Sequence, residues 1–193
     1  MGTLDFGPAT TTVAGIVAGV RDDQLGDGTP CPAMTVADLL DHLHGLALAF
    51  TCAARKEPVP GGGAPEADGS RLSSAWREEI GGRLATLADA WADPSAYSGM
   101  TMAGPVEMPG EIAALVAIDE VVVHGWDLAR ATGQAYDPDE PAVLAALGFA
   151  QTFEVPEDAQ DGGLFGPPVA VPADARALDR LAGATGRNPA WTP

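Results

Sequence analysis

The sequence is poor in several residue types, and each shortage argues against a class of protein. Two cysteines, Cys31 and Cys52, are too few for a disulfide framework, so free thiols in a reducing cytoplasm are the simpler interpretation. Aromatic residues make up only 6% of the chain, which disfavours a stacking surface for bases. Basic residues are also scarce, with 10 Lys and Arg against 27 Asp and Glu. The net charge of −17 repels phosphate backbones and anionic lipids, so we expect neither nucleic acid nor membrane partners.

Long apolar runs and a basic N-terminus are missing as well. No uncharged apolar stretch reaches the roughly 20 residues of a membrane-spanning helix. The first residues carry neither the basic region nor the apolar run of a signal peptide, so we expect a cytoplasmic protein. A chain of 193 residues with 46% hydrophobic content can bury a substantial core, and we expect one domain over residues 1–193.

Apolar residues recur at three- and four-residue spacing through most of the chain, a pattern that predicts helices. The predicted helices span residues 10–25, 35–55, 71–91, 111–132 and 138–153, and a short one follows Asp174 and ends near Gly186. Thr35 is suited to cap the second helix, and Gly133 is suited to end the fourth.

The remaining segments are predicted to be non-helical. Residues 58–65 are rich in Gly and Pro and predict a surface loop, and residues 93–109 predict an irregular connection with an extended piece at 97–102. Prolines exclude helix from residues 165–172, which are predicted to be extended. The predicted fold class is therefore all-α, a four-helix bundle with a short extra helix and an extended C-terminal segment.

The predicted helix over residues 111–132 is apolar on nearly every bearing, which is typical of a buried helix. Its polar exceptions Glu120, His124 and Asp127 fall within an arc of about 60°. A buried ionised Glu is costly unless it is paired or bound to a metal. A Glu and a His four residues apart point the same way and can share one ion. Two interpretations stay open, a divalent-metal site and a hydrogen-bonded Glu–His pair without metal.

A metal site needs a third ligand, and the other histidines in the sequence are His42 and His44. They flank the apolar stripe of the helix over residues 35–55 on opposite sides, each about 100° from its middle. Helical periodicity therefore cannot choose between them, and Asp38 and Asp41 are further candidates. Cys31 has no base or positive group beside it in the sequence to activate its thiol.

Three stretches of the sequence match a known pattern. They are residues 29–43 (TPCPAMTVADLLDHL), residues 119–133 (DEVVVHGWDLARATG), and residues 165–172 (FGPPVAVP) followed by Asp179-Arg180-Leu181 and Gly186-Arg187-Asn188-Pro189. Together they resemble the DinB-like superfamily, in the branch of actinobacterial metal-binding proteins related to the N-terminal domain of mycothiol-dependent maleylpyruvate isomerase. The sequence departs from this pattern at Met34, where the family usually has Trp. The further C-terminal domain of the isomerase has no counterpart here, so we do not expect maleylpyruvate isomerisation itself.

The resemblance implies that His42, Glu120 and His124 are the metal ligands, and it gives no ligand role to His44. Two imidazoles and a carboxylate suit Zn²⁺, with Ni²⁺ as the alternative, and three protein ligands leave one coordination position open. Asp127 would orient a ligand or bind the substrate thiol, although an ion pair with Arg130 or with another basic group explains it equally well.

The resemblance also implies mycothiol as the co-substrate, because a metal lowers the pKa of a bound thiol. We therefore expect a metal-dependent thiol S-transferase or isomerase that acts on a small electrophile, as a monomer or a homodimer. A non-catalytic metal- or ligand-binding protein of the same fold is the alternative.

Overall fold

The structure, a computed structural model, consists of helices and one small hairpin, and it describes residues 2–32, 34–62, 66–153 and 165–193. The helices are α1 (Gly7–Gly19), α2 (Val36–Arg55), α3 (Trp76–Trp91), α4 (Gly110–Thr132), α5 (Glu140–Ala150) and α6 (Ala177–Ala184). The strands are β1 (Met100–Ala103) and β2 (Val106–Pro109), and short 3-10 turns lie at Asp22–Gln24, Gly69–Arg71 and Pro94–Tyr97. Within the described ranges, no helix has both the length and the apolar character needed to cross a bilayer.

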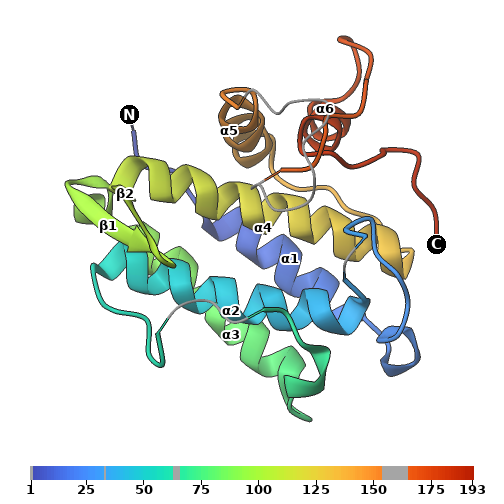
Figure 1. Cartoon of the computed structure of the whole chain (residues 1–193), viewed down its shortest axis with the longest axis horizontal. Coiled ribbons are helices and arrows are strands. Elements are labelled where there is room, and N and C mark those ends of the chain that lie inside the picture. Colours follow the sequence, from blue (N-terminus) through green and yellow to red (C-terminus); the bar gives the residue numbers. More distant parts are fainter. Residues whose placement is uncertain (1, 33, 63–65, 154–164) are drawn as a thin grey trace.

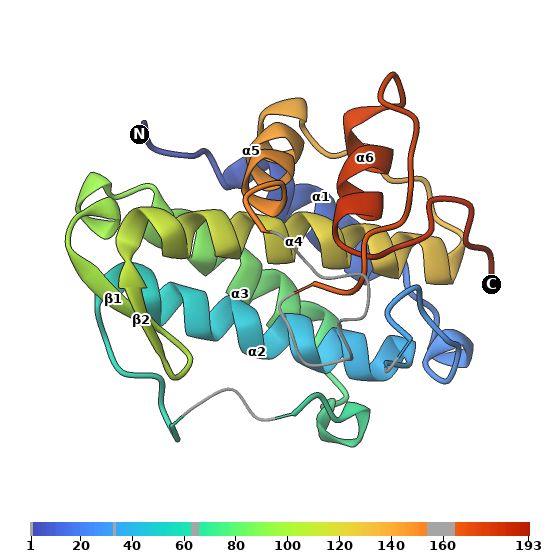
Figure 2. The ribbon, with the colours of Figure 1, turned by 45° about the horizontal axis from the view of Figure 1, so that its top comes forward.

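The helices α1, α2, α3 and α4 pack into a bundle (Figure 1). Both α1 and α2 pack against α3 and α4, so the first two helices of the chain face each other across the bundle. The apolar stripes that the spacing predicts point inward, where Leu39, Leu84 and Ile118 are fully buried. The remaining helices α5 and α6 pack on each other on the α4 side of the bundle (Figure 2). The prediction of an all-α four-helix bundle with an extra helical piece is confirmed.

The central helix α4 is buried on almost every side, as its continuous apolar sequence predicts. Gly125 allows its close packing, because a Cβ there would lie 2.5 Å from Cγ2 of Val13 on α1 and 2.6 Å from the hydroxyl of Tyr136. The helix ends at Gly133, whose φ of 68° is the left-handed conformation that glycine adopts without strain. These contacts fix α4 at the centre of the fold.

The helix α2 is anchored at its first turn. The Thr35 side chain accepts a hydrogen bond from the backbone N–H of Asp38, while the Asp38 carboxylate accepts one from the backbone N–H of Thr35. This reciprocal capping box satisfies two backbone donors that would otherwise be unpaired. It confirms Thr35 as the predicted N-cap, and it fixes the start of the helix that carries His42.

Several predicted boundaries are wrong. The first helix starts and ends earlier than residues 10–25, because Pro8 occupies its first turn and the chain is extended at Val20. The third helix begins only at Trp76, since Gly69–Arg71 forms a separate 3-10 turn capped by Asp68. The fifth helix is shorter than residues 138–153 and is capped by Asp139.

The connection before α4 contains a hairpin, whose first strand overlaps the extended piece predicted at residues 97–102 and whose second strand was not predicted. The strands β1 and β2 pair antiparallel, with Met100 opposite Pro109 and Ala103 opposite Val106. Gly104 occupies the turn with a φ of 59°. Part of the predicted loop over residues 58–65, at residues 63–65, lies outside the described residues.

Candidate metal centre

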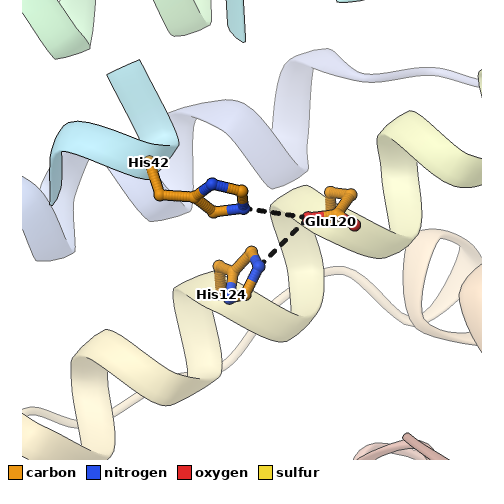
Figure 3. A group of neighbouring side chains, drawn as sticks. All are labelled: His42, Glu120 and His124. Atoms are coloured by element: carbon orange, nitrogen blue, oxygen red, sulfur yellow. Dashed lines mark ion pairs between the residues drawn. The ribbon is translucent and has the colours of Figure 1, made fainter. Parts of the chain in front are cut away.

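Two packed helices, α2 and α4, bring the three predicted ligands together (Figure 3). The carboxylate Oε2 of Glu120 lies 3.5 Å from Nε2 of His42 and 3.0 Å from Nε2 of His124. One ligand atom from each residue lies within 4.8 Å of the other two. The two imidazole rings meet edge to face with their centroids 4.8 Å apart. This arrangement could place three donor atoms around one cation.

The buried Glu120 oxygen supports this fit. Oε2 of Glu120 is buried and has no well-aligned hydrogen bond from the described residues, although the two imidazole nitrogens lie beside it. A buried carboxylate oxygen without an aligned donor is rare in folded proteins and calls for an explanation. Two imidazole nitrogens and one carboxylate oxygen that converge in this way are a donor set that Zn²⁺ accepts.

The charges of the cluster favour one protonation pattern. Burial by itself would raise the pKa of Glu120, but the imidazoles of His124 and His42 outweigh it and hold that pKa below its usual range. Burial likewise lowers the pKa of His124, but the carboxylates of Asp127 and Glu120 raise it to about 9. The carboxylate and a protonated His124 are therefore the favoured pair when no cation competes, and a bound cation must displace that proton.

Asp127 supports His124 from the side away from Glu120. Nδ1 of His124 lies 3.0 Å from Oδ2 of Asp127, in hydrogen-bond contact. The Asp127 side chain is fully buried, and Arg187 donates to it from Nε at 3.3 Å and from Nη2 at 3.0 Å. Arg130, the sequence neighbour considered as its partner, instead donates to the backbone oxygens of Pro189 and Trp191. Asp127 thus contacts both a candidate ligand and a distant basic group.

The structure brings His42, and not His44, to the α4 cluster. His44 is half-buried on the same helix and is not part of the group that could hold an ion. The two carboxylates considered as alternative ligands are engaged elsewhere. Asp38 caps α2 and accepts from the backbone N–H of Gly69, and Asp41 accepts from the guanidinium of Arg71.

Two residues of this region were missed as site residues from the sequence. Arg187 lies in one of the matched C-terminal stretches, but no periodicity links it to Asp127, 60 residues earlier. Asp119 precedes Glu120 on α4 and is buried, and its Oδ1 has no hydrogen-bond partner among the described residues. Burial and the neighbouring Glu120 hold the pKa of Asp119 well above its usual value. The sequence did carry a signal for Asp119, because a carboxylate in a helix that is apolar all round is unusual.

Comparison with known proteins relates this geometry to a family. Residues 6–129 match the model of a family described as the mycothiol maleylpyruvate isomerase N-terminal domain. Two relatives come from Mycobacterium tuberculosis, the uncharacterized protein MT0763 of strain CDC 1551 / Oshkosh and the uncharacterized protein Rv0738 of strain ATCC 25618 / H37Rv. Each is 30% identical to this chain over 184 residues, which cover 93% of this chain and 94% of the relative.

The fold is also similar to a solved structure. The crystal structure of the mycothiol-dependent maleylpyruvate isomerase aligns with a TM-score of 0.55 at 22% sequence identity, and a mutant of the isomerase aligns with the same TM-score at 21%. The alignment covers 72% of this chain but only 63% of the isomerase chain. The shared part is therefore the helical fold, and this chain spans less than two thirds of the isomerase.

Proposed function

The chain belongs to the mycothiol maleylpyruvate isomerase N-terminal domain family, and on that premise we propose that it binds one divalent metal ion through His42, Glu120 and His124. The observation that carries the proposal is the convergence of the two Nε2 atoms on the buried Oε2 of Glu120. Zn²⁺ suits two imidazoles and one carboxylate best, and Ni²⁺ is the alternative.

The proposed activity is metal-dependent transfer or isomerisation that uses a small thiol, for which the family name points to mycothiol. A divalent metal at this site would lower the pKa of a bound thiol, so that thiolate is available at neutral pH. In S-transfer the sulfur bonds to the electrophilic carbon, the thiol proton passes to solvent, and the leaving group departs with the bonding electron pair. In isomerisation no group leaves, and the sulfur is expelled again after the rearrangement.

Asp127 and Arg187 hold His124 in an orientation that suits metal binding. Asp127 accepts the Nδ1–H of His124, so that Nε2 of the same ring is the atom left to face Glu120. Arg187 in turn holds Asp127 with two hydrogen bonds. These contacts orient His124 before any ion arrives, so less conformational entropy of its side chain is lost when the ion binds.

Metal analysis of protein without a histidine tag, followed by calorimetric titration with mycothiol, tests the proposal. We expect one divalent ion per chain, thiol binding that requires the ion, and conjugation of the thiol to members of an electrophile panel. His44→Ala is the matched control and should retain the ion, while Glu120→Gln should lose it. Protein free of any stoichiometric divalent ion would refute the proposal. Thiol binding without turnover across the panel would favour the non-catalytic alternative.

A further inference from the structure

A cavity of about 910 Å³ opens beside the candidate metal centre. Its walls come from α2, α4, the hairpin, residues 59–62, and the end of α5 with the residues after it. Both His42 and Glu120 line the cavity. Cavities of several hundred Å³ are the size that small-molecule sites usually have. The cavity is therefore continuous with the cluster and large enough for a substrate.

Most of the cavity wall is hydrophobic. Phe149 and Phe153 of its α5 side contact each other edge to face at 5.0 Å. Val106 of the hairpin and Ile112 of α4 also line the cavity and remain 53% and 40% exposed. Large apolar side chains left in contact with solvent around a concave site are typical of a surface that binds an apolar partner.

The charged residues of the wall leave no free cation for a carboxylate. Arg71 is the one Lys or Arg among the described lining residues, and its guanidinium is bound by the Asp41 carboxylate and approached by Asp68. Asp41 and Glu120 line the same cavity, in a chain whose net charge is −17. The ion of the proposed function lies at one end of the cavity and could pair with one carboxylate. The second carboxylate of a dicarboxylate such as maleylpyruvate would lose water here without gaining a matching cation from the wall, which is unfavourable.

We propose that this cavity binds the electrophilic substrate, and that this substrate is an uncharged, largely apolar aromatic or alkyl compound whose reactive carbon lies at the His42 and Glu120 end. The chemical role rests on the proposed function, whereas the binding preference rests on the cavity itself. The aromatic pair Phe149 and Phe153 would contact the apolar body of the compound. A neutral electrophile is also what an acidic protein admits without repulsion.

Fluorescence titration with N-phenyl-1-naphthylamine, a neutral aromatic probe, tests the binding preference on the full chain. We expect saturable binding that maleate, a dicarboxylate, does not displace. Val106→Asp places a charge at the cavity wall, on a side chain that is already half exposed, and should weaken probe binding at least tenfold. Leu144→Asp is the matched control, because Leu144 is 51% exposed, lies on α5 and does not line the cavity.

Removal of the ion with a chelator separates this inference from the proposed function. Wild-type protein freed of metal should keep probe binding, because the wall that would contact the probe is largely apolar. Three results would each overturn the inference. The first is probe binding that Val106→Asp does not weaken, and the second is displacement of the probe by maleate. The third is metal-loaded protein that binds the thiol but not the neutral probe. A dimer that Val106→Asp dissociates in sedimentation would also overturn it, by showing that a second copy covers this face. Probe binding that Val106→Asp abolishes in a protein without metal would uphold the inference and refute the proposed function.

Discussion

The two helices that form the candidate metal centre hold their histidines in different ways. On α4, His124 is buried, lies against the fully buried Asp127, and is backed through it by Arg187. On α2, His42 is 30% exposed, lines the cavity, and has no hydrogen bond at Nδ1 from the described residues. The α4 histidine thus belongs to a buried polar network inside an apolar core. The α2 histidine lies at the edge of the proposed substrate cavity, where it is partly exposed to solvent.

This difference has a physical consequence for binding and stability. A buried polar network is favourable only while each of its groups has a hydrogen-bond or charge partner. Removing one of its side chains on α4 should therefore lower folding stability and also disturb the position of His124. A partly exposed histidine can be solvated by water when its partners change. Substitution of His42 on α2 should therefore weaken ion binding more than it lowers folding stability.

The largest effect should come from removing a ligand. His124→Ala should weaken metal binding by about a thousandfold, because each ligand carries a large share of the binding free energy of such sites. His42→Ala should weaken the metal by a similar factor but lower the melting temperature much less, since His42 is already partly exposed. Competition with a chromophoric chelator measures the affinity, and calorimetry measures the melting temperature. Equal melting temperatures for the two variants would show that His124 contributes no more to folding stability than His42 does.

The next effect concerns the far end of the α4 network. Arg187→Ala leaves the fully buried Asp127 carboxylate without its cation, so we expect a loss of about 3 kcal/mol in the free energy of unfolding. Urea denaturation of protein freed of metal measures this loss without a contribution from the ion.

Arg176→Ala is the matched control for Arg187. Arg176 pairs with Asp137, and their side chains are 70% and 95% exposed. Its loss should change the free energy of unfolding by less than about 0.5 kcal/mol. Similar losses for the two arginine variants would show that Asp127 gains nothing from Arg187 beyond what a surface pair provides.

Asp127→Asn should have an intermediate effect on the ion. The amide can still contact His124, but it removes the negative charge that strengthens the imidazole as a donor. We expect metal affinity to fall by about ten- to a hundredfold, with the metal still bound at stoichiometric ratio. Unchanged affinity would mean that Asp127 serves the fold alone, as the partner of Arg187.

The sequence predicted the parts of this site that depend on local pattern. The N-cap at Thr35 is a short-range signal and placed the start of α2 correctly. The apolar character of α4 on every bearing showed that Glu120, His124 and Asp127 were unusual, because polar groups are rare in a buried helix.

The parts that local pattern left open or missed depend on contacts between distant segments. Helical periodicity left His42 tied with His44. The family resemblance named His42, and the packing of α2 on α4 brings it to Glu120. The link from Arg187 to Asp127 joins segments 60 residues apart and has no period to detect. The hairpin β1–β2 has four-residue strands, too short for an alternating pattern to stand out against irregular structure.

The smallest predicted effect is a pH dependence that comes from the α4 side. The pKa of His124 is raised to about 9, so its proton must leave before an ion can bind at neutral pH. Metal affinity should therefore rise by about tenfold from pH 7 to pH 8 and level off above pH 9. The same raised pKa stabilises the metal-free fold fully below pH 6.5, and that stabilisation is lost as the pH rises through 9.

Asp127→Asn tests the origin of this pH dependence. The Asp127 carboxylate is the largest of the influences that raise the pKa of His124, so its neutralisation should lower that pKa and flatten the rise in metal affinity between pH 7 and pH 8. His44→Ala should leave the rise intact, because His44 is not part of the cluster. Chelator competition at the two pH values measures both variants. A wild-type affinity that does not change between pH 7 and pH 8 would show that the α4 network does not hold a proton on His124, and the contrast between the two histidines would then lie in burial alone.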